Sequence, residues 1–224
     1  MNLPVASFSL INKWENCRYQ TARMYLPAQL GIPSLPREPD NKAQQEGNEI
    51  HDAFARRIRD KIPFPEKMQA YEKWTRPLDM YHIEPEMRVS ILSDGTVHNG
   101  YDGAWLFTKI DCPIIGDDEQ TAMLMDWKSG ANVREEPLEL YVQALCLKAK
   151  YPKLQKITGH YVWLKYDRLG LPHDCSNVAR TWHIVNTHMR NIDDAMRLNE
   201  FPKNPGPLCK WCPVKDCEHN KAPK

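Results

Sequence analysis

The sequence predicts an α/β fold, with a mixed central sheet covered by helices on both sides. Two observations carry this prediction. Helical patterns precede and follow a group of short alternating polar and apolar segments, and one helical segment separates two apolar strand segments. A chain of 224 residues is long enough for one sizeable domain, or for one domain with an appendage.

The N-terminal third is predicted to be mainly helical. Residues 7–26 begin with serines that suit a helix cap and contain no Pro or Gly, so they predict a helix. The Pro-rich stretch 27–41 predicts a loop. Residues 41–62 predict a second helix, because apolar residues recur there at fourfold spacing. Residues 64–75 are ambiguous, with a short helix around 68–74 as one interpretation.

Strand patterns begin near residue 86. Residues 86–110 alternate around the dipeptide Asp94-Gly95, which is a strong hairpin signal. Residues 134–151 predict a helix, with acids early and lysines late as the helix dipole favours. The remaining elements are predicted as strands 121–128, 156–167 and 178–185 and a final helix 186–201.

The composition sets limits on where the protein works. A net charge of +1 neither predicts nor excludes binding of nucleic acid. The sequence has no apolar run near the length of a membrane-spanning helix, and its start lacks the pattern of a signal peptide. We therefore expect a cytoplasmic protein without a membrane partner, in which disulfides do not persist.

Acidic residues mark the ends of two predicted strands. Asp126 and Lys128 are two residues apart and so share one face where an apolar strand ends. Asp102 lies between glycines on the preceding predicted strand. Two carboxylates on adjacent strands would bind a hard cation such as Mg²⁺, with a lysine beside it. Taken alone, these residues equally allow an ion pair at a sheet edge, with Asp102 in a turn.

The order of these residues resembles the PD-(D/E)xK nuclease superfamily, specifically its RecB-like branch. The segment "NGYD" ending at Asp102 matches the branch's GxxD strand, and "DWK" at 126–128 matches its (D/E)xK strand. Upstream, "GNEIH" matches a GxxxH helix, with Gly47 and His51. The resemblance implies a restriction-endonuclease-like α/β/α core.

The same resemblance implies roles for individual residues. Lys128 would position the attacking water. The ligands of one or two Mg²⁺ or Mn²⁺ ions would be His51, Asp102, Asp126 and Glu86, with Glu84 as the alternative to Glu86. The branch carries a QxxxY motif on the next helix, but this chain has Glu139 and Gln143 at those positions. Gln143 is kept as a catalytic residue despite this departure.

Three cysteines near the C-terminus indicate a second metal site. Cys209, Cys212 and Cys217 have the spacing C-x2-C-x4-C, and such spacing in a reducing compartment predicts metal ligation. Either His219 or the distant Cys17 would complete four ligands. Zinc and an iron–sulfur cluster are both consistent with these ligands.

Some RecB-like nucleases, including CRISPR-associated and phage-encoded members, hold a [4Fe-4S] cluster. Its ligands are one cysteine of the N-terminal helix and three of the C-terminal tail, which implies Cys17, Cys209, Cys212 and Cys217 here. The resemblance further implies a single domain, 1–224, in which residues 1–30 and 200–219 form a clamp around a nuclease core of 45–200. Zn²⁺ remains the alternative to the cluster.

The function implied is metal-dependent hydrolysis of DNA. The resemblance favours an exonuclease acting on single- or double-stranded DNA ends, in recombination, repair, or phage or defence DNA processing. A phage-encoded enzyme would work in the host cytoplasm. The alternatives are a DNA-binding module without catalysis and a zinc-stabilised interaction module. A homo-oligomer and partner proteins from recombination or defence stay open.

Overall fold

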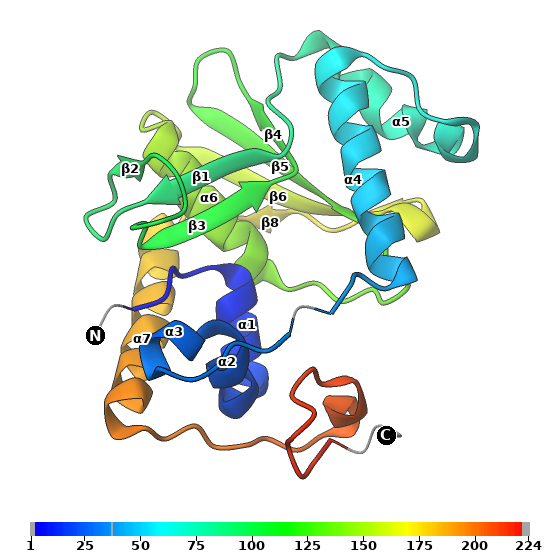
Figure 1. Cartoon of the computed structure of the whole chain (residues 1–224). Coiled ribbons are helices and arrows are strands. Elements are labelled where there is room, and N and C mark those ends of the chain that lie inside the picture. The colour runs from blue at the N-terminus through cyan, green and yellow to red at the C-terminus, as the bar shows by residue number, and fades with distance from the viewer. Residues whose placement is uncertain (1–2, 37, 221–224) are drawn as a thin grey trace. The chain divides into compact units, whose positions relative to one another are not determined.

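The computed structural model describes residues 3–36 and 38–220 (Figure 1). The chain divides into two compact units, residues 1–39 with 182–224, and residues 40–181. The predicted single domain with a clamp stays a prediction, and its residues 1–2, 37 and 221–224 lie outside the described residues. The first unit differs from the predicted clamp by including most of the last long helix.

The first unit begins with three short helices, α1 (Phe8–Asn16), α2 (Arg18–Tyr25) and α3 (Pro27–Leu30). The predicted single helix 7–26 is therefore broken, and the break lies at Cys17, which has extended backbone angles. Its Sγ accepts a hydrogen bond from the Gln20 amide at 3.5 Å and so caps α2. The break gives Cys17 a different environment from that of a residue inside a helix.

The N-terminal helices and the Cys-rich tail pack together within this unit, as predicted. Arg23 forms an ion pair with Asp216 at 2.8 Å. The Asn204 side-chain amide donates to the Asn16 carbonyl at 2.9 Å. The short helix η4 (Pro207–Trp211) carries the first of the tail cysteines.

The prediction of a strand at 178–185 is wrong, because the whole segment belongs to α7 (Val178–Leu198). The β-branched residues of this segment favour a strand, but Asn177 accepts a hydrogen bond from the Arg180 amide at 3.1 Å and caps a helix. Buried apolar residues then recur every three or four positions, at Val185, Met189, Ile192 and Met196.

The second unit starts with α4 (Lys42–Asp60), which confirms the helix predicted at 41–62. A reciprocal capping box between Asn41 and Gln44 fixes its first turn. Three short helical elements follow, namely η1 (Glu66–Tyr71), α5 (Glu72–Thr75) and η2 (Arg76–Met80). Arg57 of α4 binds carboxylates of both α5 and η2.

Two sheets form the centre of this unit. The first is antiparallel in the order β2-β1-β3, with strands β1 (Met87–Ile91), β2 (Val97–His98) and β3 (Leu106–Ile110). The second has the order β4-β5-β6-β7, with β8 beside β6. Its strands are β4 (Cys112–Ile115), β5 (Thr121–Lys128), β6 (Lys156–Trp163), β7 (Arg168–Leu169) and β8 (His173–Asp174).

The second sheet is mixed, which confirms the predicted α/β class. β5 pairs with β4 in antiparallel and with β6 in parallel orientation. The parallel pair needs a crossover connection, and α6 (Pro137–Lys150) supplies it. α6 packs against strands of both sheets (Figure 1). The hairpin at Asp94-Gly95 is confirmed by β1 and β2, whereas β4 was not predicted.

Side chains of β5 alternate between two environments. Met125 and Trp127 join a buried cluster with Phe54 of α4. Asp126 and Lys128 point the other way and contact α6. Successive residues of a strand face opposite sides of a sheet, so α4 and α6 cover opposite faces of β5. In the part of the chain that the structure describes, no helix has the length and apolar character needed to cross a membrane.

Candidate active site

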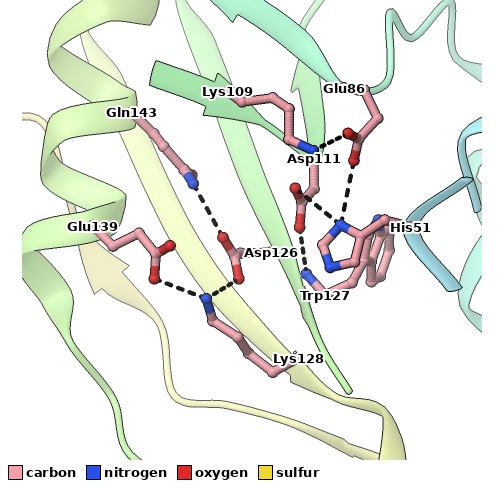
Figure 2. A network of polar contacts seen from close by, with 9 residues as sticks. All are labelled: His51, Glu86, Lys109, Asp111, Asp126, Trp127, Lys128, Glu139 and Gln143. Carbon is pink, nitrogen blue, oxygen red and sulfur yellow. Dashed lines mark hydrogen bonds and ion pairs between the residues drawn. The ribbon is translucent and has the colours of Figure 1, made fainter. Parts of the chain in front are cut away.

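Three metal-ligating side chains meet beside the two sheets. His51 Nδ1 lies 3.3 Å from Glu86 Oε1 and 3.4 Å from Asp111 Oδ1. One ligand atom from each of the three residues lies within 4.8 Å of the others. Figure 2 shows His51 pointing from α4 toward both carboxylates, with Lys109 on the far side of Glu86. An imidazole and two carboxylates at this spacing form a candidate site for a divalent cation.

The backbone places Glu86 next to Asp111. The Glu86 amide donates to the Asp111 carbonyl at 2.9 Å, just before β1 and just after β3. Glu86 has a φ of 58°, in the left-handed region, where a residue with a Cβ atom costs about 1–2 kcal/mol. Such strain persists only where the surroundings enforce it, and it gathers at functional sites.

His51 reaches the carboxylates from the middle of α4. Gly47 lies one turn earlier, where a Cβ atom would come within 3.4 Å of Ser129 Oγ. Such a contact is an ordinary van der Waals contact, so the start of α4 lies beside the residue that follows β5. Residues four apart share one face of a helix, so this placement brings His51 to the same side.

Asp111 connects this group to β5. Its Oδ2 accepts a hydrogen bond from the Trp127 amide at 2.9 Å, so the carboxylate spans from His51 to the neighbour of Asp126 and Lys128. Asp111 is also the single residue between β3 and β4. The chain thus changes sheets at the residue that carries the central carboxylate.

Lys128 lies between two carboxylates on the α6 side of the sheet (Figure 2). Its Nζ is 2.7 Å from Asp126 Oδ2 and 2.8 Å from Glu139 Oε2. The Gln143 amide donates to Asp126 Oδ1 at 3.1 Å. Tyr161 of the neighbouring strand places its ring 5.1 Å from the ammonium. These contacts fix both members of the Asp126-Lys128 pair.

Burial and neighbouring charges shift the pKa values of three side chains in the site. Burial lowers the pKa of His51, but hydrogen bonds to Asp111 and Glu86 outweigh it, and the net pKa is about 10. Burial raises the pKa of Asp126, and Asp111 and Glu139 raise it further against the effect of Lys128. Burial lowers the pKa of Lys128, but Asp126 and Glu139 outweigh it and raise the net pKa. Lys128 is therefore an ammonium at neutral pH.

The surroundings of Asp126 fit a bound cation. Asp126 Oδ2 is buried, and its polar contact among the described residues is the ion pair with Lys128. Gln143 Oε1 is also buried and accepts no hydrogen bond from the residues that the structure describes. Buried oxygens without donors are costly, and the mutual repulsion that raises the pKa of Asp126 would be relieved by a positive ion.

A comparison with protein families identifies this arrangement. The family profile described as the PD-(D/E)XK nuclease superfamily matches residues 37–217, which is most of the chain. The chain belongs to the PD-(D/E)XK nuclease superfamily. Membership implies metal-dependent nuclease activity. The His51, Glu86 and Asp111 group is the one among the described residues that could hold a metal ion.

Other comparisons add little to this assignment. The nuclease is similar to a protein described by "Crystal structure of SSO0001", at 12% identity and a TM-score of 0.49. The match covers 98% of this chain and 88% of that chain. A comparison with curated proteins finds no match.

The structure corrects one predicted residue of the nuclease. Asp102 is exposed in the turn between β2 and β3, where its carbonyl contacts His98 at 2.9 Å. Asp111 follows the opposite end of β3, and five strand residues span about 16 Å. The motif "NGYD" therefore does not end a strand, and Asp111 has the place that the prediction gave to Asp102.

The other predicted residues of the active site lie in one network. His51 and Glu86 contact each other, and Gln143 and Lys128 contact Asp126. Glu84 instead pairs with Lys150 at the surface. Their catalytic and ligand roles stay predictions.

Sequence reasoning missed three residues of this network, Asp111, Lys109 and Glu139 as a partner of Lys128. Lys109 forms an ion pair with Glu86. The signal for Asp111 was present in "LFTKID", where an acid follows an alternating strand segment directly. Glu139 was noted as a departure from QxxxY, but only the structure pairs its carboxylate with Lys128.

The predicted cysteine ligands all belong to the first unit. Cys17, Cys209, Cys212 and Cys217 are half-buried free thiols. Burial raises the pKa of Cys212, and the other three thiols add to this rise. Cys112 and Cys146 are buried in the second unit, as expected for ordinary core thiols. The metal role of the four stays a prediction.

We predict that Asp111→Asn weakens binding of Mn²⁺ to the nuclease by at least about tenfold, a loss typical for a disturbed metal site. Asparagine keeps an acceptor for the Trp127 amide, so the fold is retained while one anionic ligand is lost. Isothermal titration calorimetry of Mn²⁺ into the protein, without DNA or with a DNA that cannot be cleaved, measures the change in affinity. Asp102→Asn is the matched control and should bind as the parent does. If Asp102→Asn weakened Mn²⁺ binding more than Asp111→Asn, Asp102 rather than Asp111 would be the metal ligand.

We also predict that metal affinity rises with pH. A cation needs the neutral imidazole of His51, whose pKa is about 10 without metal, so binding at lower pH must displace a proton. The affinity for Mn²⁺ should increase up to about tenfold per pH unit between pH 7 and 9. Calorimetry in buffers of different ionisation enthalpy counts the released proton. The variant His51→Ala should lose this dependence, and a flat profile in the parent protein would contradict the assignment of His51.

Proposed function

We propose that this nuclease is an exodeoxyribonuclease of the RecB-like branch that uses Mg²⁺ or Mn²⁺ to hydrolyse phosphodiester bonds at DNA ends. One observation carries the proposal: the Asp126-Lys128 pair lies next to the group of His51, Glu86 and Asp111. The link is Trp127, the residue between Asp126 and Lys128, whose amide donates a hydrogen bond to Asp111. The placement of a lysine beside clustered carboxylates suits water attack on a phosphate.

The metal would be held by residues of the second unit alone. His51, Glu86, Asp111 and Asp126 offer one imidazole and three carboxylates, which suit Mg²⁺ and Mn²⁺. A divalent ion bound there polarises the phosphoryl oxygens and neutralises their charge. The remaining contribution must come from the side chains that position the water and the phosphate.

Lys128 is suited to that positioning. An ammonium has three donors, and Asp126 and Glu139 engage it from two sides at 2.7 and 2.8 Å. One donor is left for the attacking water or a phosphate oxygen. Because its pKa is raised, Lys128 does not act as a general base. Its role is to orient the water and to stabilise negative charge.

The finer assignment rests on the family resemblance. Exonuclease action on DNA ends is the commoner activity of small stand-alone RecB-like members, and recombination, repair, and phage or defence DNA processing are their pathways. DNA is the substrate that the superfamily implies.

We further propose a [4Fe-4S] cluster on Cys17, Cys209, Cys212 and Cys217. One zinc ion would draw its ligand sulfurs to about 2.3 Å from itself and so to less than 4.8 Å from one another. Among the described residues, no three of these sulfurs lie within 4.8 Å of one another, with or without His219. The other three thiols lie close enough to Cys212 to raise its pKa, which supports one shared site for the four cysteines. Binding of the cluster would add folding free energy to the first unit.

We predict that Asp126→Ala and Lys128→Ala each lower the rate of DNA cleavage by at least about 100-fold, a loss typical when one charged group stabilising the transition state is removed. End-labelled single- and double-stranded DNA with Mg²⁺ or Mn²⁺ measures the rate. Lys128→Ala should retain Mn²⁺ binding, whereas Asp126→Ala should weaken it.

Two controls sharpen this experiment. Lys109→Ala tests whether any lysine near the carboxylates matters equally, and it should lose less activity than Lys128→Ala. Closed circular DNA should resist an exonuclease, so rapid cleavage of circles would replace the proposed end specificity by endonuclease action. Equal cleavage by parent and Asp126→Ala protein would remove the enzyme proposal altogether.

We predict that the protein purified without oxygen is brown, with broad visible absorption and equal amounts of iron and sulfide. Cys17→Ala and Cys209→Ala should lose the colour and lower the melting temperature, because the cluster contributes to folding. Cys146→Ala, which removes a thiol of the second unit, should keep the colour. A colourless parent protein with one bound zinc would refute the cluster.

A further inference from the structure

A cavity of about 380 Å³ lies within the first unit, away from the residues assigned to catalysis. It is formed by the α1–α2 junction, the middle of α7 and the segment after α7. The charged and polar side chains of its lining are Glu15, Arg18, His188, Asn191, Lys203 and Asn204, with Trp14 beside Arg18. The Glu15 carboxylate is paired with His188. Nothing in the proposed hydrolysis uses this cavity.

Arg18 presents a cation without an anionic partner. Its guanidinium lies 5.0 Å from the centre of the Trp14 ring, and the ring orients it as a cation–π pair does. Within the described ranges, Arg18 makes no ion pair, whereas Arg23 one turn later is paired with Asp216. A guanidinium without an anionic partner suits bidentate binding of a phosphate.

His188 adds a buried polar atom without a partner. Its Nε2 lies 3.3 Å from Glu15 Oε1, and its side chain is 16% exposed. Its Nδ1 is buried and has no hydrogen-bond partner among the described residues. Because it is buried, this nitrogen cannot bond a molecule in the cavity, and His188 contributes only its exposed ring surface to the lining.

Two side-chain amides complete the polar lining. Asn191 lies one turn after His188 on α7 and is exposed to the cavity. Asn204 uses its amino group to bind the Asn16 carbonyl at 2.9 Å, which leaves its oxygen free to accept a hydrogen bond. Lys203 is held by Glu218 at 2.6 Å. Amides of this kind pair with donors and acceptors on the edges of nucleobases.

We propose that this cavity is a nucleotide-binding pocket in which Arg18 binds the phosphate and the asparagines contact the base. Its volume is at the low end of ligand pockets, about 300–1,000 Å³, which fits one nucleotide rather than a duplex. The nucleotide comes either from a free monophosphate, such as a product of hydrolysis, or from within a single strand. Both sources share the phosphate and base that the pocket recognises.

The test measures binding to the full-length protein by calorimetry without added divalent cation, so that cleavage does not contribute. The probes are thymidine 5′-monophosphate, thymidine, and a short 5′-phosphorylated oligothymidylate. We expect the phosphorylated probes to bind and thymidine to bind at least about tenfold more weakly, because charged hydrogen bonds to the phosphate are lost. Binding of the oligonucleotide alone assigns the pocket to a strand, and binding of the monophosphate assigns it to the free nucleotide.

Variants locate the binding. Arg18→Glu should weaken the phosphorylated probes by at least about tenfold. Asn191→Ala should weaken them less, and it makes no contact on which the fold depends. Arg190→Ala removes an exposed cation next to Asn191 on α7 but outside the cavity, and it should bind as the parent does. Melting temperatures show whether each variant is folded.

Two results would overturn the pocket. One is that no phosphorylated probe binds, and the other is that Arg18→Glu and Asn191→Ala both bind as Arg190→Ala does. Neither result depends on hydrolysis, because divalent cations are absent. If the protein cleaves DNA but fails this test, only the nucleotide-binding pocket is refuted. If it passes this test but does not cleave DNA, only the proposed nuclease function is refuted.

Discussion

The hydrogen bond from the Trp127 amide to Asp111 is the interaction on which the catalytic network depends. Asp111 is the single residue between β3 and β4, so it lies where the chain leaves one sheet and enters the other. The bond fixes its carboxylate against β5, and the Glu86 amide bound to its carbonyl fixes Glu86 beside it. Only α4 must then bring His51 to this point. Three ligands separated by 60 residues of sequence therefore depend on one backbone junction.

The carboxylates of the site outnumber its positively charged side chains. Glu86, Asp111, Asp126 and Glu139 lie in one network. Burial raises the pKa of Asp126, and repulsion from Asp111 and Glu139 raises it further. Without metal, a proton on His51 and the ammonium of Lys109 offset part of this charge. A divalent ion does the same with one compact charge and replaces the proton. The excess of carboxylates therefore favours binding of a cation, and without metal Lys128 is charged at neutral pH.

Local patterns predicted the parts of this site that a single element determines. The apolar run along residues 121–128 predicted β5 and the two-residue spacing predicted the shared face of Asp126 and Lys128, while helical spacing predicted α4 around His51. The error at Asp102 has a different origin, because a short motif placed a strand where glycines at positive φ form a turn. Asp111 depends on the meeting of two sheets, which no local pattern encodes. The strand expected at 178–185 failed because an asparagine cap and long-range burial outweigh β propensity.

The two units of the chain hold different proposed sites. Every residue of the catalytic network lies within 40–181, and no described residue of the first unit belongs to the His51, Glu86 and Asp111 group. The first unit holds instead the four cysteines and the cavity beside Arg18. Cys17, at the break between α1 and α2, belongs to both features. It lines the cavity, and it is also a proposed cluster ligand. A cluster that orders Cys17 would also order the adjacent Arg18 and the start of α2. The proposed cluster in the first unit would then influence the binding of nucleotides, whereas the proposed divalent ion of the second unit would act on the phosphate that is cleaved.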